Sequence, residues 1–140
     1  MKIIAALQKK YPDSQAWSFG DSPEMADELA ALVAQGIKTA SCCSYASYSQ
    51  DRSITPGSYH IILDGQNAPV CVIRIIAMNL VRFNEVTDEQ AYKEGEGDRS
   101  LRYWRQAHRE FFARGGFWAE EMELITEEFS VVERVTPSSA

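Results

Sequence analysis

The sequence predicts one α+β domain over residues 1–140, in which a small mixed β-barrel is flanked by helices. Two observations predict this class. Segments with helical periodicity lie near the N-terminus and after residue 87, and extended, β-branched stretches lie between and after them. The length is sufficient for one hydrophobic core, and the chain contains no internal repeat or linker.

The N-terminal part predicts two helices. The first covers residues 2–10 and ends before a Tyr-Pro pair. Ser22 is a good N-cap for the second helix, because Pro23 then occupies the first helical position. Gly36 is expected to end this helix in a left-handed conformation. Apolar residues recur at helical spacing and predict a stripe that faces the core: Met25, Leu29, Leu32 and Val33.

The middle of the chain predicts strands. Residues 39–49 are rich in Ser, Thr, Tyr and Cys, and predict a strand followed by a loop. After a turn at 55–57, residues 58–64 predict a strand and 65–67 a hairpin loop. Residues 70–80 are nearly all apolar and many are β-branched, so they are the strongest candidate for a central strand.

The C-terminal part returns to helices before a last strand. Thr87 is a suitable N-cap for a short helix over 88–93, and residues 100–113 predict a longer helix. Residues 128–135 predict a closing strand, and 136–140 a frayed tail.

Charge and composition restrict the function classes. The net charge of −6 disfavours a non-specific binder of DNA or RNA, whose affinity depends on phosphate contacts. A hydrophobic fraction of 45% is typical of a soluble globular protein. The apolar stretch at residues 3–7 is too short for a signal-peptide core or a membrane span, so we expect a cytoplasmic protein with no membrane partner.

The cysteines and histidines do not predict a metal site. The chain has no Cys-x-x-Cys motif and its two histidines are far apart, so a structural zinc site is not expected. Cys42, Cys43 and Cys71 are interpreted as buried, small apolar residues. We expect neither a metal nor another cofactor.

A lysine and a hydroxyl follow the glycine that ends the second helix. Lys38 precedes Ser41 by three residues, and a lysine can activate a serine as a base when its pKa is lowered. Residues three apart in a strand point to opposite faces, so the pair converges only if the backbone is irregular near Thr39 and Ala40. The alternative, a solvated lysine followed by a polar strand residue, stays open.

Three acids lie within five residues, at Glu94, Glu96 and Asp98. They repel one another unless a cation, arginines or shared protons balance them. Their spacing does not match an EF-hand. They could supply the carboxylate that a Lys38 site needs, or form a solvated loop that caps the next helix.

The helix over 100–113 has two different faces. Arg102, Arg105 and Arg109 lie on one side, where they could bind phosphates or neutralise the acidic loop. Trp104 and His108 lie on the other side with Leu101 and Phe111. Trp104 could stack on a base or pack in the core, and the same two interpretations apply to Tyr59. His108 is interpreted as a core histidine.

Several stretches together resemble the ASCH family, named for homology to a transcriptional coactivator. They cover almost the whole chain, and the run that begins at Glu94 is the most specific. The stretches are Trp17–Asp21, Gly36–Ser41, Pro56-Gly57, Phe83–Val86, Glu94–Arg105 with His108, and Phe129–Val132.

The resemblance implies a PUA-like β-barrel, similar to the RNA-binding domain of pseudouridine synthases and archaeosine transglycosylases. Members of this kind are regarded as RNA-binding or nucleoside-binding. Some small bacterial members are amidohydrolases that deacylate N4-acetylcytidine, and others are described as ribonucleases. The amidohydrolases use a lysine, a threonine three residues later and a distant glutamate. These positions fall on Lys38, Ser41 and Glu94, with Glu96 as a competing assignment for the acid.

The sequence therefore predicts a small amidohydrolase acting on N4-acylated cytosine nucleosides, as a monomer or small homo-oligomer. Ser41 would attack and Lys38 would accept and return its proton. Glu94 would orient Lys38 or assist protonation of the leaving amine. Backbone N–H groups near Gly36 would stabilise the oxyanion. The other residues expected to bind substrate are Thr39, Glu96, Trp104, Arg105 and Tyr59. The alternatives are an RNA-binding module that uses the three arginines, and a ribonuclease.

Overall fold

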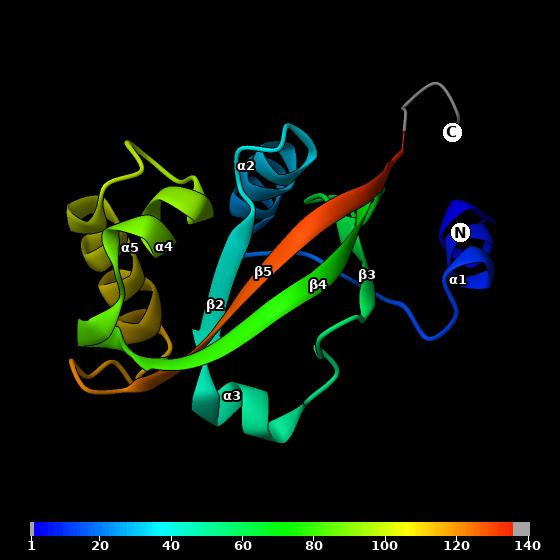
Figure 1. The fold of residues 1–140 in the computed structure, drawn as a ribbon. Helices are drawn as coiled ribbons and strands as arrows, with labels where there is room; N and C mark the ends of the chain where they lie inside the picture. The colour runs from blue at the N-terminus through cyan, green and yellow to red at the C-terminus, as the bar shows by residue number, and fades with distance from the viewer. Residues whose placement is uncertain (1, 136–140) are drawn as a thin grey trace.

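Five strands form one mixed sheet at the centre of the molecule (Figure 1). The computed structural model describes residues 2–135, so the predicted tail at 136–140 lies outside the described residues. The strand order is β1-β3-β4-β5-β2, with β1 parallel to β3 and the other neighbours antiparallel. The strands are Gln15–Trp17 (β1), Ala40–Ser44 (β2), Tyr59–Leu63 (β3), Pro69–Arg82 (β4) and Glu123–Arg134 (β5).

The long β4–β5 pair gives the sheet its curvature. Its register shifts between Val72 and Ile73 and again between Ile75 and Ala77, and such bulges bend a strand and increase its twist. The sheet curls into a half-barrel (Figure 1). The predicted α+β fold, with a small mixed barrel flanked by helices, is confirmed.

Helices cover the sheet and both of its ends. Figure 1 shows α4 and α5 together at one end, α1 at the other, and α2 and α3 on opposite sides of the strands. The 3₁₀ helix Phe83–Glu85 follows β4. The α-helices are Lys2–Lys10 (α1), Pro23–Ala34 (α2), Tyr45–Gln50 (α3), Asp88–Glu94 (α4) and Leu101–Arg114 (α5).

Most element boundaries agree with the sequence pattern, and the differences have physical causes. As predicted, Ser22 caps α2 and accepts from the Met25 N–H, and Gly36 follows the helix with φ +78°. The loop expected after β2 is instead helix α3, which has no buried residue and hence no apolar periodicity to reveal it. The closing strand begins at Glu123 rather than 128, because it pairs with the whole length of β4.

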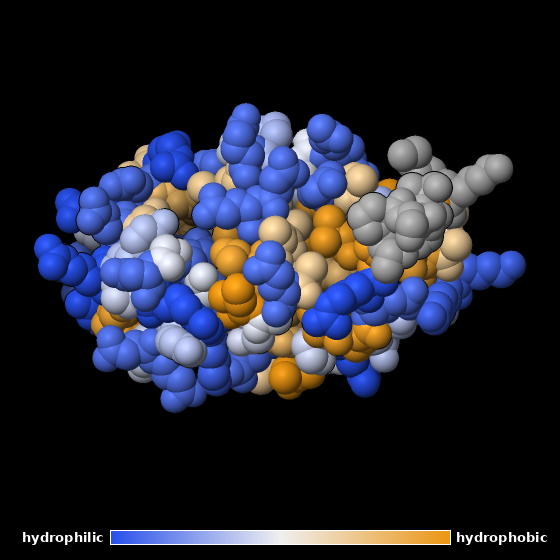
Figure 2. All heavy atoms as spheres, turned by 90° about the horizontal axis from the view of Figure 1, so that it is seen from above, coloured by the Kyte–Doolittle hydropathy of each residue, from blue (hydrophilic) through white to orange (hydrophobic). Residues whose placement is uncertain are grey.

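Two packed clusters flank the site. In one, the predicted apolar stripe of α2 packs against the sheet through Leu29 and Val33. In the other, α4 and α5 pack through Ala91, Trp104 and Phe112. The surface at the α4–α5 end is predominantly hydrophilic, whereas apolar residues gather over the middle of the molecule (Figure 2). Within the described part of the chain, none of the helices has the length and apolarity needed to cross a membrane.

Candidate active site

Lys38 lies in the connection between α2 and β2, and its side chain is 1% exposed. Gly36 turns the chain, and the Lys38 N–H then donates to the Leu32 carbonyl at 3.1 Å. Lys38 Nζ donates to Glu96 Oε2 at 2.8 Å and to the backbone oxygen of Glu94 at 3.3 Å. Glu94 Oε1 is 3.9 Å from Nζ. Both glutamates therefore surround Lys38, and Glu96 makes the shorter contact.

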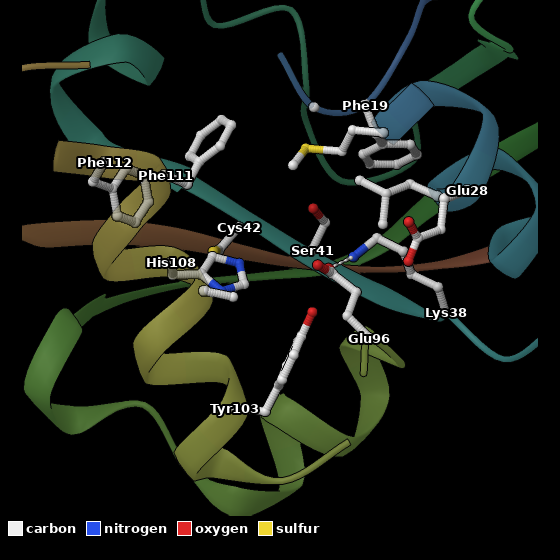
Figure 3. Close-up of a pocket in the computed structure, with 14 residues that line it drawn as sticks. Phe19, Glu28, Lys38, Ser41, Cys42, Glu96, Tyr103, His108, Phe111 and Phe112 are labelled. Carbon is white, nitrogen blue, oxygen red and sulfur yellow. Dashed lines mark hydrogen bonds and ion pairs between the residues drawn. The ribbon is translucent and has the colours of Figure 1, made fainter. Parts of the chain in front are cut away.

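Ser41 lines the same cavity as Lys38 (Figure 3). Strand β2 begins at Ala40, so Lys38 precedes the strand and the alternation of strand side chains does not separate the pair. The Thr39 N–H donates to the Lys93 carbonyl of α4 at 2.7 Å, so the segment just before β2 is bonded to α4. Among the described residues, no hydrogen bond joins Lys38 Nζ and Ser41 Oγ.

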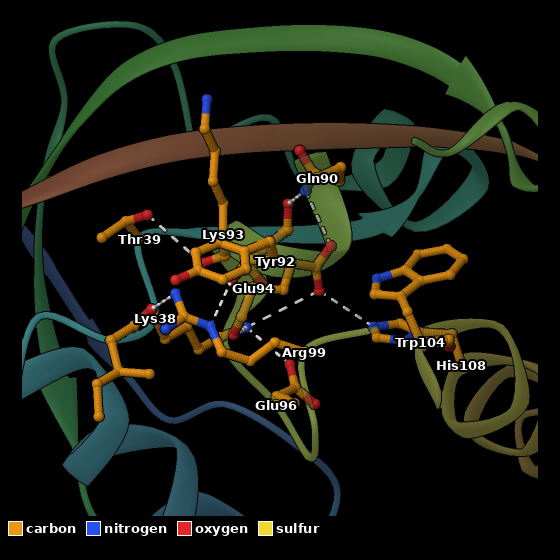
Figure 4. Close-up of polar contacts among 12 residues, drawn as sticks. Lys38, Thr39, Gln90, Tyr92, Lys93, Glu94, Glu96, Arg99, Trp104 and His108 are labelled. Carbon is orange, nitrogen blue, oxygen red and sulfur yellow. Dashed lines mark hydrogen bonds and ion pairs between the residues drawn. The ribbon is translucent and has the colours of Figure 1, made fainter. Parts of the chain in front are cut away.

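Glu94 is the last residue of α4 and is fully buried. Gly95 ends the helix with φ +74°, a left-handed conformation that favours glycine. Glu94 Oε2 accepts from Gln90 Nε2 at 2.9 Å, and Oε1 lies 3.2 Å from His108 Nε2 (Figure 4). The carboxylate therefore links α4, α5 and Lys38.

The loop after α4 is held against the Lys38 segment. A Cβ on Gly95 would lie 2.7 Å from the Ile37 oxygen, so the two backbones approach as closely as a glycine allows. Arg99 donates from Nη2 to the Ile37 oxygen at 3.3 Å and from Nε to the Tyr92 oxygen at 3.0 Å. These contacts fix Glu94 and Glu96 beside Lys38.

His108 was predicted as a core histidine, but its ring reaches the cavity from α5. Its Nδ1 lies 2.9 Å from the Trp104 carbonyl, and the imidazole stacks on the Trp104 ring at 4.2 Å. Since a carbonyl oxygen only accepts, Nδ1 carries a proton and Nε2 faces Glu94. Packing and hydrogen bonding therefore orient the imidazole.

Mutual charge determines the protonation of these groups. Burial alone would lower the pKa of Lys38, but the Glu94 and Glu96 carboxylates outweigh burial and raise it. Burial would raise the pKa of Glu94, but contacts with His108 and the charge of Lys38 lower it to about 2. Burial alone would also lower the pKa of His108, but its contact with the Glu94 carboxylate outweighs burial and raises it. At neutral pH Lys38 is an ammonium and Glu94 a carboxylate.

The cavity has a volume of about 170 Å³ and lies between α2, β2 and α5. That is smaller than the roughly 300–1,000 Å³ typical of sites for drug-sized ligands, so an enclosed ligand is a small organic group. Its wall combines apolar and polar groups. The apolar residues are Phe19, Met25, Leu29, Cys42, Ala107, Phe111 and Phe112, and the polar side chains are Glu28, Lys38, Ser41, Glu96, Tyr103 and His108.

Three residues expected to bind substrate lie away from the cavity. Trp104 is 2% exposed and packs on Phe83 with ring centroids 5.1 Å apart, which corrects the prediction that it stacks on a base. Arg105 lines a separate groove on α5. Tyr59 packs against Tyr11 near α1, because β3 places it at the opposite end of the sheet.

The expected oxyanion site near Gly36 is also corrected. The Gly36 N–H donates to the Val33 carbonyl at 3.0 Å, and each N–H from 36 to 39 is likewise bonded to a backbone carbonyl. Gly36 itself is exposed, and Thr39 Oγ1 donates to the Lys93 carbonyl at 3.4 Å. Neither residue has a free backbone donor to offer a ligand.

Glu127 is a buried acid next to the site that the sequence analysis missed. It is 4% exposed, and the β2–β5 register places it directly opposite Ser41. Burial raises its pKa to about 7, with the Glu94 charge adding to this effect and Lys38 opposing it. Its position depends on strand pairing, which local sequence does not encode.

Gln90 and Cys42 were missed as well. Gln90 bonds Glu94 from one helical turn earlier, a spacing that the sequence contains. Cys42 adjoins Ser41 and lines the cavity. Its Sγ, a carboxylate oxygen of Glu94 and a ring nitrogen of His108 lie within 4.8 Å of one another. These are ligand types that a divalent transition metal accepts.

The curled mixed sheet with its flanking helices is a PUA-like α+β fold. The chain matches the ASCH domain family model over residues 15–133, and it belongs to the ASCH domain family. A search of curated proteins gave no match.

Solved structures agree with this assignment. The chain is similar to the ASCH domain from Lactobacillus crispatus JV V101, with 34% identity and a TM-score of 0.81 over 92% of this chain and 86% of that chain. It is also similar to protein EF3133 from Enterococcus faecalis V583, with 31% identity and a TM-score of 0.84 over 99% of this chain and 90% of that one. The hypothetical protein PH0355, at 15% identity and a TM-score of 0.58 over 85% and 97% of the two chains, shares the fold.

Proposed function

We propose that this ASCH protein is an amidohydrolase that removes the acyl group from N4-acylated cytosine nucleosides. The observation that carries the proposal is the convergence of three positions that are distant in sequence. Lys38 and Ser41 line one small cavity, and Glu94 lies 3.9 Å from Lys38 Nζ. Membership in a family associated with hydrolases and RNA binding is compatible with this activity.

The reaction divides into acylation and hydrolysis. Ser41 Oγ attacks the amide carbonyl carbon and loses its proton, the C–N bond breaks, and the N4 amine leaves after gaining a proton. Water then attacks the acyl-serine ester, releases the carboxylic acid and restores the hydroxyl. Lys38 transfers the protons, and Glu94 holds Lys38 in place.

For Lys38 to accept a proton, it must first become neutral. Its 2.8 Å contact with Glu96 is the one that substrate can break, because the Glu96 side chain is 20% exposed whereas that of Glu94 is 1% exposed. Once Glu96 moves away, burial lowers the pKa of Lys38 with less opposition. Displacement of Glu96 by the substrate would therefore activate the lysine.

Charge favours a nucleoside over a nucleotide. Glu28 and Glu96 lie in the cavity wall, and among the described residues Lys38 is the only lysine or arginine that lines it. The net charge of −6 acts in the same direction. A phosphate group would therefore be repelled, whereas an uncharged acylated base would not.

The direct test is turnover of N4-acetylcytidine by purified protein. Lys38→Met is expected to lower kcat/KM by at least 100-fold, the lower range for loss of a general acid–base. Lys10→Met is the matched control, since Lys10 is exposed on α1 at the other end of the molecule. The proposal fails if the wild-type protein does not turn over the substrate or if Lys38→Met keeps full activity.

RNA binding is a second candidate, supported by a groove on α5. Arg102, Arg105 and Arg109 line it together with Trp118, and the Arg109 guanidinium lies 4.5 Å from the Trp118 ring centroid. Clustered arginines beside an aromatic ring can bind phosphates and stack on bases.

The groove is tested with single-stranded RNA at several salt concentrations. Replacing the three arginines with glutamine is expected to weaken binding and reduce its salt dependence, whereas Arg74→Gln on β4 is a control outside the groove. Absent or salt-independent binding would rule this candidate out. Cleavage of the RNA, compared with and without a chelator, would identify a ribonuclease.

A further inference from the structure

Cys42, Glu94 and His108 place one sulfur, one oxygen and one nitrogen ligand in a compact group within 4.8 Å. They come from β2, α4 and α5, so no short sequence motif predicts that they lie together. In a tetrahedral zinc site the ligand atoms lie about 3.3–3.7 Å apart, given bonds of about 2.0–2.3 Å. We propose that these three side chains bind a single Zn²⁺, with its fourth position open to the cavity.

The Glu94 carboxylate has a free ligand atom. Glu94 is fully buried, yet its Oε1 accepts no hydrogen bond of good geometry from the described residues, and its nearest polar neighbour is His108 Nε2 at 3.2 Å. A buried carboxylate oxygen without a donor is costly in a protein interior. A cation between Oε1 and Nε2 would satisfy both atoms, and their 3.2 Å separation is close to that of two ligands on one zinc.

Hydrogen bonds to neighbouring groups already orient two of the proposed ligands, His108 and Glu94. The Trp104 carbonyl accepts from His108 Nδ1 at 2.9 Å and leaves Nε2 as the ligand atom. Gln90 Nε2 holds Glu94 Oε2 at 2.9 Å and leaves Oε1 free. Metal-bound histidines and carboxylates are usually held in this way.

Charge and access are suitable for a divalent cation. The Cys42 thiolate and the Glu94 carboxylate would balance Zn²⁺, and Glu96 at 2.8 Å is the nearer partner of Lys38, whose Nζ lies 3.9 Å from Glu94 Oε1. Both Cys42 and His108 line the cavity, so the fourth position faces a water or ligand there. Zinc binds cysteine as the thiolate, so binding releases a proton and the affinity should rise with pH.

Cobalt(II) is a spectroscopic probe of this site, and it needs no substrate. Titration of metal-free protein with Co²⁺ is expected to produce, at one equivalent, a thiolate-to-cobalt charge-transfer band that Zn²⁺ then removes. Absence of this band, or a band that Zn²⁺ does not displace, would overturn the proposal. Since the readout is metal binding, it is independent of whether the protein hydrolyses amides.

Matched variants assign the ligands. Cys42→Ser is expected to abolish the band and weaken Zn²⁺ binding at least tenfold, whereas Cys43→Ser, whose side chain lies outside the group, should keep both. Gln90→Ala removes a supporting contact and should weaken Zn²⁺ binding about 10–100-fold. Thermal unfolding of each variant verifies its fold. A band that survives Cys42→Ser or disappears in Cys43→Ser contradicts the assignment.

Discussion

Lys38 and Glu96 form the shortest ion pair in the cavity, with Nζ donating to Oε2 at 2.8 Å. Glu94 lies farther from the ammonium, at 3.9 Å, but Gln90 and His108 fix its carboxylate in the protein interior. The two glutamates, which the sequence could not distinguish, therefore differ in exposure and in the contacts that hold them. Glu94 is suited to positioning Lys38, and Glu96 to responding to a ligand.

Removal of the Glu96 charge should change the pH dependence of turnover. Glu96→Gln lowers the pKa of Lys38, because one of the two charges that oppose burial is lost. If Lys38 acts as the base, the rising limb of the pH–kcat/KM profile moves to lower pH. A falling limb that moves instead would show that Lys38 acts as an ammonium.

Glu94→Gln should reduce catalytic activity more than Glu96→Gln does. It removes the carboxylate that contacts both Lys38 and His108, while keeping the size of the side chain. We expect kcat/KM to fall by at least 100-fold at every pH, against a pH-dependent change for Glu96→Gln. Equal losses in both variants would contradict the different roles assigned to the two glutamates.

Ser41 can be tested with two substitutions, one that removes the hydroxyl and one that keeps it. Ser41→Ala should lower kcat/KM by at least 100-fold, since no nucleophile remains. Ser41→Thr keeps Oγ and adds a methyl group that restricts χ1, so its activity should stay within about tenfold of the wild type. Full activity in Ser41→Ala would exclude the acyl-serine step.

Glu127 should make the fold less stable as the pH rises. Burial raises its pKa to about 7, so between about pH 4.5 and 7 the folded state holds a proton that the unfolded state has lost. The free energy of unfolding should fall by on the order of 3 kcal/mol across this window.

The control for this prediction is Glu127→Gln, which should flatten the slope in urea unfolding measured between pH 4.5 and 7. His108, whose pKa is also raised, contributes a loss of stability at higher pH, and Glu127→Gln leaves that part in place. An unchanged slope in Glu127→Gln would contradict the prediction.

Two glycines with similar backbone angles should respond differently to alanine. Gly36 has φ +78° and an added Cβ would meet no atom within 4 Å, so Gly36→Ala should cost about 1 kcal/mol, from the left-handed conformation alone. At Gly95, with φ +74°, the Cβ would also lie 2.7 Å from the Ile37 oxygen. Gly95→Ala should cost on the order of 3 kcal/mol in urea unfolding, and equal costs would show that this close approach is unimportant.

The fold could be inferred from local patterns, whereas the assignment of Lys38, Ser41 and Glu94 came from resemblance to the ASCH family. Ser22 and Pro23 begin α2, Gly36 ends it, and the apolar run in β4 marks the centre of the sheet, because caps and periodicity act over a few residues. Helix α3 was not predicted because it buries no residue, so its sequence has no apolar periodicity.

The substrate-binding residues proved harder to predict. Trp104 and Tyr59 are aromatic residues whose sequence context allows either a core or a ligand role, and packing places Trp104 in the core and Tyr59 against α1. Arg105 lies on the face of α5 that points away from the cavity, which depends on how that helix docks. Helical spacing separates the two faces of α5 but does not show what each one meets.

The sequence by itself determined the α+β class, the helix ends and the presence of a lysine, a hydroxyl and two glutamates in short, recognisable segments. Only the tertiary structure brought these segments around one cavity, added Glu127 across the β2–β5 pair, and placed Cys42 and His108 beside Glu94. The physical reason is the range of the interactions. Caps and periodicity operate within a few residues, whereas protonation and ligand geometry depend on burial and on charges contributed by distant parts of the chain.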